Sequence, residues 1–225
     1  DPTVAATLQA GLARLRREQK FLDVTLRVPS ANGGLAIQAH AVVLCALSAP
    51  LEGMLLGNDK LAPSKDAEGN LELPELDGEA VRSLVEYMYT GELEVTGASA
   101  WSVLAAAEFL RLGEAKKLCA GALAEKLTAE TALGAAEAAE LYRCPELKAE
   151  ATAFAKEHFE AMSEGEEWLS LSVDRVKALL MEDDVRVTSE LKVVEALARW
   201  AEHSPGDRTD AFTALFVDPQ AVRLS

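Results

Sequence analysis

Apolar and polar residues follow two different periods along this chain. Alternation over 21–28, 35–40 and 71–76 predicts three strands, and the short segment 92–95 is a candidate fourth. Helical spacing predicts the remaining elements of the first half, namely 3–19, 40–48, 49–55, 79–90, 99–111 and 114–126. After Thr128 the helical signals dominate, at 129–142, 145–160, 164–170, 172–181 and 189–202. The pattern therefore predicts an α+β first half and an all-helical second half.

The first predicted helix carries an apolar stripe. Val4, Leu8, Leu12 and Leu15 fall on one side of the helix, while the charged residues of this segment lie elsewhere. This helix precedes every other element of the chain. The stripe must therefore pack either on the core formed by later elements or on a second molecule.

The segment AHAVVLCALSAPLEGML, residues 39–55, predicts a helix, a tight corner at Pro50 and a second short helix. Its two reactive side chains are His40 and Cys45. They are five residues apart across a helix start, and the sequence offers no third group to orient the imidazole. We therefore interpret both as packing residues, and not as a base and a nucleophile.

Composition and charge narrow the class of protein. The formal net charge is −15, which disfavours binding to nucleic acid or to an anionic membrane surface. No apolar run approaches the ~20 residues that span a bilayer, and charges interrupt the N-terminal segment too early for a signal peptide. The three cysteines, Cys45, Cys119 and Cys144, form no CxxC pair and predict reduced thiols in or near a core. We expect no metal or cofactor, because His40, His158 and His203 are not spaced as ligands.

Several segments, taken in order, resemble a known family. FLDVTLRV, IQAHAVVLCALSAPLEGML, LVEYMYTGELEV and VLAAAEFLRLGEAKKLCAGAL resemble a BTB (POZ) domain. ALGAAEAAELYRCPELKAEA, EHFEAMSEGEEWLSLSVDRVKALLMEDDVRV and SELKVVEALARWAEH resemble the BACK domain of BTB–Kelch proteins. The resemblance implies a BTB/POZ fold over 1–126, a small sheet with helices, followed by an all-α BACK domain over 127–225.

The resemblance implies a homodimer, because the first helix of such BTB domains packs against the partner subunit. The residues that match this interface are Leu8, Leu12, Leu15, Leu22 and Val24. The alternative is that the same stripe packs inside its own subunit. An apolar stripe with no partner would otherwise remain an exposed patch.

The resemblance also implies a surface for the N-terminal domain of cullin-3, the scaffold of a ubiquitin ligase. The matching residues are Met54, Leu55, Leu61, Ala62, Phe109, Leu112, Leu141, Tyr142 and Leu147. In the family the loop after the second short helix often carries a glutamate, and Pro63 stands at that place here. The alternatives are a solvated loop around Leu61 and a BACK core role for Leu141, Tyr142 and Leu147.

The resemblance favours a non-enzymatic adaptor that dimerises, binds cullin-3 and holds a substrate through a C-terminal domain absent from this chain. The chain ends near VRLS, apparently inside the BACK domain, and contains no Kelch repeats. The alternative is a self-association scaffold, cytoskeletal or transcriptional, that binds no cullin. Asp23 suits the transcriptional class, but Ala41 stands where that class places a basic residue. We expect a cytoplasmic location, with the nucleus as a second compartment.

Overall fold

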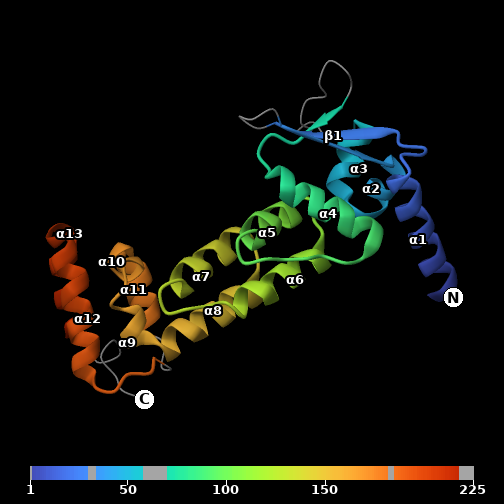
Figure 1. Ribbon diagram of the computed structural model, residues 1–225. Coiled ribbons are helices and arrows are strands. Elements are labelled where there is room, and N and C mark those ends of the chain that lie inside the picture. Colours follow the sequence, from blue (N-terminus) through green and yellow to red (C-terminus); the bar gives the residue numbers. More distant parts are fainter. Residues whose placement is uncertain (1, 30–33, 58–69, 182–184, 218–225) are drawn as a thin grey trace. The chain divides into compact units, whose positions relative to one another are not determined.

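The computed structural model describes residues 2–29, 34–57, 70–181 and 185–217 (Figure 1). The chain divides into two compact units between Leu123 and Ala124. Each unit has its own buried core, and the two are described separately below.

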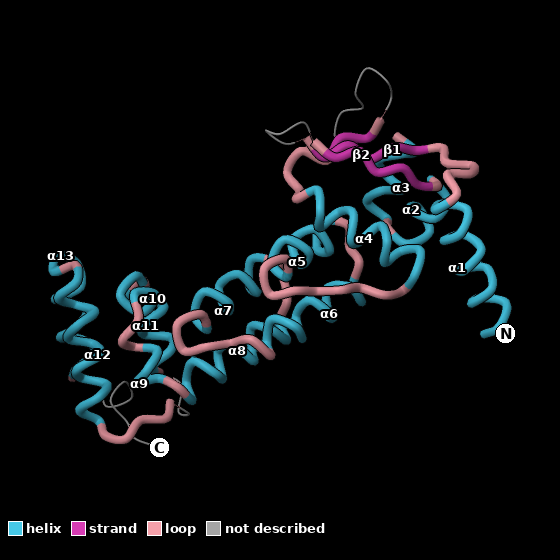
Figure 2. The backbone as a smooth tube through the Cα atoms, viewed as in Figure 1, coloured by secondary structure: helices cyan, strands magenta, loops and turns pink. Residues whose placement is uncertain are grey.

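The first unit combines a small sheet with helices (Figure 2). Its elements are α1 (Pro2–Arg17), β1 (Val24–Val28), β2 (Leu35–Ala39), α2 (Ala41–Leu47), α3 (Ala49–Leu56), β3 (Leu71–Glu72), α4 (Gly78–Thr90), α5 (Ala100–Phe109) and α6 (Gly113–Ala124). The strand order of the described sheet is β2-β1-β3, with β1 antiparallel to β2 and parallel to β3.

Alternation along β1 and β2 determines which side chains enter the core. Leu26 pairs with Ile37, and both are buried, while the neighbouring pair of Arg27 and Ala36 is exposed on the other face. Helix α4 contributes the predicted apolar side, including Val81, Leu84, Val85 and Met88, to the core. Asp77 caps α4 by accepting from the backbone N–H of Ala80 at 2.8 Å, as predicted.

Three predicted strand segments differ from the structure. Strand β1 begins at Val24 and not at residue 21, because Gln19 and Phe21 have positive φ values of 54° and 60° and form a turn. Strand β3 has two residues, and Pro74, which has no N–H to donate to a ladder, follows soon after it. Residues 92–95 form a loop, so the prediction of a strand there is wrong.

The second unit is helical throughout the part that the structure describes. Its helices are α7 (Ala132–Leu141), α8 (Pro145–Glu157), α9 (Phe159–Met162), α10 (Glu166–Ser170), α11 (Val173–Leu180), α12 (Glu190–His203) and α13 (Pro205–Phe216). The sequence patterns did not predict α13, because Pro205 and Gly206 resemble a helix end. Proline at the first helical position is nevertheless favourable, since its missing N–H would be unpaired there anyway.

Two tryptophans anchor the core of the second unit. Trp168 and Trp200 are fully buried, and each indole N–H donates to a backbone carbonyl, of Ala196 at 2.9 Å and of Leu171 at 2.8 Å. Phe159 packs edge-on against Trp168 with ring centroids 5.5 Å apart. The polar edges of both indoles are therefore satisfied inside an apolar core.

Candidate protein-interaction surfaces

Helix α1 is attached to the first unit through Arg16. The guanidinium of Arg16 pairs with the carboxylate of Glu86 on α4, donates to the carbonyl of Gln38 at 3.2 Å and lies 4.9 Å from the centre of the Tyr89 ring. These contacts hold the C-terminal half of α1 against α4 and β2. They leave Val4 and Leu8, in the N-terminal half of the helix, largely exposed.

The predicted apolar stripe of α1 is exposed chiefly in the N-terminal half of the helix. Val4 and Leu8 are 67% and 62% exposed, and Leu12 and Leu15 are half-buried. In the turn that follows, Phe21 is 79% exposed, although its ring was not among the predicted interface residues. Leu22 and Val24, which were predicted, are half-buried. Exposed apolar side chains gathered on one helix and the following turn are typical of a contact site for another protein.

His40 and Cys45 are packing residues, as interpreted from the sequence. His40 is buried, its Nδ1 lies 2.8 Å from the Tyr89 hydroxyl, and its Nε2 lies 2.9 Å from the Lys20 carbonyl. Since the Lys20 carbonyl can only accept, Nε2 donates to it and Nδ1 accepts from Tyr89. Burial raises the pKa of Tyr89, and burial also raises the pKa of the Cys45 thiol, which opposes thiolate formation.

Asp23 has a structural role that the sequence did not reveal. Its carboxylate accepts a hydrogen bond at 2.7 Å from the backbone N–H of Ala41, the first residue of α2. A carboxylate at a helix N-terminus satisfies an otherwise unpaired donor and complements the helix dipole. Asp23 and Ala41 are 18 residues apart in the sequence, so a local pattern cannot connect them. The pairing of β1 with β2 brings them together.

Ser48 joins the two halves of the predicted cullin surface within the first unit. Its buried hydroxyl accepts from the backbone N–H of Leu51 at 3.3 Å and donates to the carbonyl of Leu110 at 2.8 Å. The first contact caps α3, and the second ties the start of α3 to the end of α5. Phe109, at the end of α5, is 40% exposed beside this junction.

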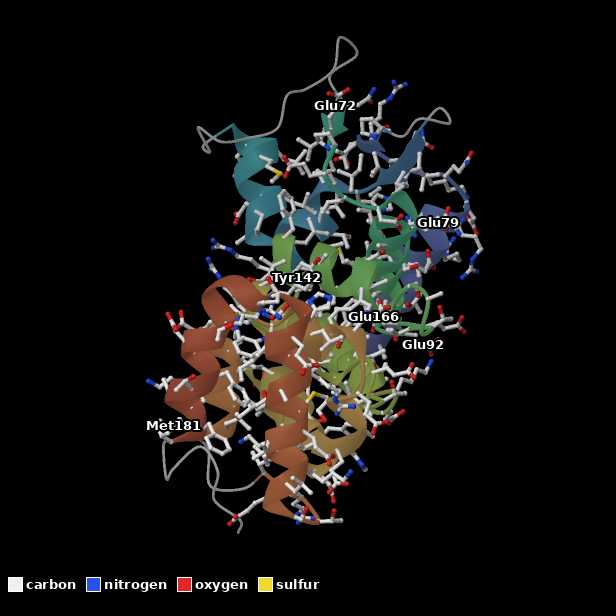
Figure 3. All side chains as sticks on the ribbon, turned by 90° about the vertical axis from the view of Figure 1, so that its left-hand side faces the viewer. Glu72, Glu79, Glu92, Tyr142, Glu166 and Met181 are labelled. Atoms are coloured by element: carbon white, nitrogen blue, oxygen red, sulfur yellow. The ribbon has the colours of Figure 1, made fainter. Side chains whose placement is uncertain are left out.

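The predicted cullin-binding residues differ in how accessible they are. Leu141 and Phe109 are exposed, and Leu55 and Tyr142 are half-buried; Tyr142 follows α7 and is labelled in Figure 3. Met54, Leu112 and Leu147 are buried, so their side chains support the surface from beneath and offer little area to a partner. Leu61 and Ala62, together with Pro63, lie outside the described residues.

Sequence patterns missed two exposed leucines near the same junction. Leu47 ends α2 one residue before Ser48, and Leu56 ends α3 one residue before Gly57, which has a φ of 70°. Their exposed fractions are 50% and 62%. A leucine directly before a helix-terminating glycine is a weak signal, because apolar residues commonly pack under such an end.

Charges border Leu141 in the second unit. Glu140 accepts from Arg175 at 2.9 Å and lies 3.3 Å from Lys148. The hydrogen bond from Arg175, followed by that from Lys148, lowers the pKa of Glu140 below its ordinary value. Exposed Leu141 is therefore flanked by a charged network on one side.

The described residues form neither a metal-binding group nor a membrane-spanning helix. In the described ranges, no three His, Cys, Asp or Glu side chains gather into a group suited to hold a metal ion. Among the helices that the structure describes, none combines the length and the apolar character required to cross a membrane.

A small mixed sheet, a helix with an unpartnered apolar side and a following helical unit define a protein-interaction module. The model of the BTB/POZ domain matches residues 12–127, and the model of BACK, "BTB And C-terminal Kelch", matches residues 132–225. The chain therefore belongs to the BTB–BACK family of Kelch-like proteins. The resemblance and the fold class inferred from the sequence are confirmed.

Individual relatives agree with this assignment. Kelch-like protein 3 of Homo sapiens is 33% identical over 210 residues, which cover 93% of this chain and 34% of that protein. Kelch-like protein 2 of Homo sapiens is 31% identical over the same shares. This chain thus spans about a third of the length of the curated relatives it matches. A solved BTB domain of zebrafish PATZ1 has a TM-score of 0.46 and 21% identity, covering 56% of this chain and 96% of that one.

Proposed function

We propose that this chain is the dimerising adaptor module of a cullin-3 ubiquitin ligase. In this role it joins the cullin to a domain that selects the substrate. The assignment to the BTB–BACK family supports the adaptor class, and the exposed apolar side of α1 is the observation that carries the proposal. A dimer would present two substrate-binding domains at once and raise the avidity for a substrate with two recognition segments.

The accessible area on α1 supports dimerisation through Leu8, Leu12, Leu15, Leu22 and Val24. Burying one fully exposed leucine against a partner contributes about 1.5–3 kcal/mol. Leu8 is 62% exposed and Val4 lies one helical turn before it, so a symmetric contact would bury both on each subunit. Phe21 extends the same proposal to the turn after α1.

The junction at Ser48 supports a cullin surface on the first unit. Leu55 and Phe109 from the predicted set, with Leu47 and Leu56 from the structure, offer apolar area at the ends of α2, α3 and α5. We also assign Leu141 and Tyr142 of the second unit to cullin contact. Pro63 in place of the family's glutamate would cost a charge-assisted hydrogen bond, about 1.5–3 kcal/mol, unless another contact replaces it.

The test combines titration calorimetry against the N-terminal domain of cullin-3 with light scattering. The expected result is tight binding by a species with about twice the 24.1 kDa mass of the chain. Leu8→Asp should give a monomer that still binds the cullin domain. Phe109→Asp should remain a dimer and lose binding. Leu191→Asp, on an equally exposed leucine of α12, is the control and should change neither property.

The same experiment decides between the adaptor and the scaffold. A dimer that binds no cullin would refute the ligase proposal and favour a self-association scaffold, with Pro63 as the first residue to change. A Pro63→Glu variant that gains affinity would then place this loop at the cullin contact. A wild-type chain that is monomeric would refute the assignment of the α1 stripe.

A further inference from the structure

A cleft of about 620 Å³ lies in the first unit between α1, the sheet and α4. Of its described lining residues, four are arginines, namely Arg16, Arg17, Arg27 and Arg82, and one is a carboxylate, Glu86. The whole chain carries a net charge of −15, so this concentration of positive charge contrasts with the overall composition. The four arginines outnumber the one carboxylate, so the lining is positive on balance, and a concave site of this kind attracts groups of opposite charge.

The cleft also contains the outer edge of β2, with which no other strand pairs among the described residues. Strand β2 is at one end of the sheet, and the carbonyl of Ala39 accepts from the N–H of Asp23 on the side of β1. Backbone groups of successive strand residues point to opposite sides, so those of Ala36 and Gln38 point away from β1. The hydrogen bond from Arg16 to the Gln38 carbonyl agrees with this direction. Both residues line the cleft, which therefore offers an edge that another strand can extend.

The arginines differ in how readily they can meet a ligand. Arg16 is held by Glu86 and its side chain is only 16% exposed, so it shapes the cleft. Arg17 is exposed on α1. Arg82 pairs with Glu79, labelled on α4 in Figure 3, and both side chains are about two-thirds exposed. Exposed ion pairs contribute little stability, so Arg82 can exchange Glu79 for a carboxylate of a partner at small cost.

We propose that this cleft binds an extended acidic segment of a partner protein. The segment adds a strand to β2 through the backbone of Ala36 and the N–H of Gln38, whose carbonyl already accepts from Arg16. It places its carboxylates near Arg17, Arg27 and Arg82. Arg27 is suited to this contact because it stands opposite Ala36 in the register of the exposed sheet face.

A second copy of the chain is a poor occupant of the cleft. Pairing two β2 edges would bring two sets of arginines face to face, and like charges across strands are destabilising. The site is also separate from the apolar stripe, because Ala13 and Arg17 lie on the side of α1 away from Val4, Leu8 and Leu15, as the helical period requires. Leu22 lines the cleft and also belongs to the proposed dimer surface, so the two sites adjoin at this residue. None of the assigned cullin-contact residues lines the cleft, so acidic peptide binding is independent of the cullin proposal.

The first test measures fluorescence anisotropy of a labelled short peptide of alternating valine and glutamate, added to the full chain. The double variant Arg17→Glu/Arg82→Glu should bind the peptide with an affinity at least about tenfold lower than that of the wild type, because two charge-assisted contacts are reversed. The control Arg186→Glu/Lys192→Glu makes the same change in net charge at exposed positions of the second unit and should retain the wild-type affinity. A peptide of alternating valine and lysine should not bind.

The second test addresses the backbone edge. Ala36→Pro removes an N–H that points away from β1 and should abolish peptide binding, whereas Ala36→Val retains that N–H and should bind like wild type. Equal affinities of the two Ala36 variants would overturn the proposal. Equal weakening by the two charge-reversed double variants would also overturn it, and this comparison remains decisive if Ala36→Pro fails to fold.

Discussion

Arg208 connects three segments of the second unit through its guanidinium. It lies on α13 and donates to three backbone carbonyls, of Leu169 at 2.7 Å, Trp200 at 2.9 Å and Leu171 at 3.2 Å. Its guanidinium also lies 4.7 Å from the centre of the Trp200 ring. One cation therefore joins the end of α10, the end of α12 and the start of α13.

The expected effect of Arg208→Ala follows from these contacts. The Leu171 carbonyl keeps its hydrogen bond from the Trp200 indole, so two carbonyls, of Leu169 and Trp200, lose a charged donor. Each such hydrogen bond contributes about 1.5–3 kcal/mol, and the stack on Trp200 adds about 0.5–1 kcal/mol. Since Arg208 is partly exposed and water can replace some contacts, we take the lower end and expect a loss of about 3–4 kcal/mol. Arg208→Lys should lose about half of this, because lysine lacks the planar fork.

Native-state hydrogen exchange measures this loss within the second unit alone. Peptides from α10, α12 and α13 should exchange through an opening reaction that is easier by the predicted free energy. Arg186→Ala is the matched control, because Arg186 forms an exposed pair with Glu157 at 2.9 Å and should contribute less than about 1 kcal/mol. A loss in Arg208→Ala no larger than in the control would refute the reasoning.

Three further predictions concern single side chains. Ser48→Ala should destabilise the first unit by about 1–3 kcal/mol in urea denaturation, because the hydroxyl is buried and bonded to Leu51 and Leu110; an unchanged midpoint would contradict this. Tyr89→Phe should cost a similar amount, since the N–H and Nδ1 of His40 lose one shared partner, and the light-scattering mass should not change. The pKa of Glu160 is lowered chiefly by hydrogen bonds from Thr188, so its contribution is present above the ordinary value of 4.5 and is lost as pH falls through the lower folded pKa. Denaturation midpoints between about pH 6 and about pH 3 should therefore fall less in Glu160→Gln than in wild type, and identical profiles would exclude this role.

The fold could be predicted where one face of an element is polar and the other apolar. Strands β1 and β2 and helix α4 have such faces, and their buried residues alternate or repeat as the sequence indicates. Helix α5, AWSVLAAAEF, is apolar on nearly every side, so its sequence does not say which residues face solvent. Phe109 is exposed while nearby Leu112 is buried, and only packing against the rest of the unit separates them.

The contacts that connect distant segments were beyond the reach of local patterns. Ser48 meets Leu110 across 62 residues, and Arg208 meets Leu169 across 39. A serine two residues before a proline, or an arginine three residues after one, is common in sequences. The partner in both cases is a backbone carbonyl, which every residue possesses. The sequence around such a side chain therefore does not indicate its hydrogen-bond partner, because the partner is determined by the tertiary structure.

For helix α1, the sequence predicts the apolar surface but does not predict the role of the charged residues. Its leucine stripe follows the helical period and was found from the sequence, together with the expectation that a second molecule covers it. Arg17 lies on the opposite side, and Arg16 borders the stripe one turn after Leu12; local patterns assign both arginines only to solvent. In the structure Arg16 and Arg17 lie near the outer edge of β2, where they form part of the arginine-rich cleft. If the acidic peptide binds beside Arg17, α1 serves two partners at once, because Arg17 and the exposed residues Val4 and Leu8 lie on different sides of the helix.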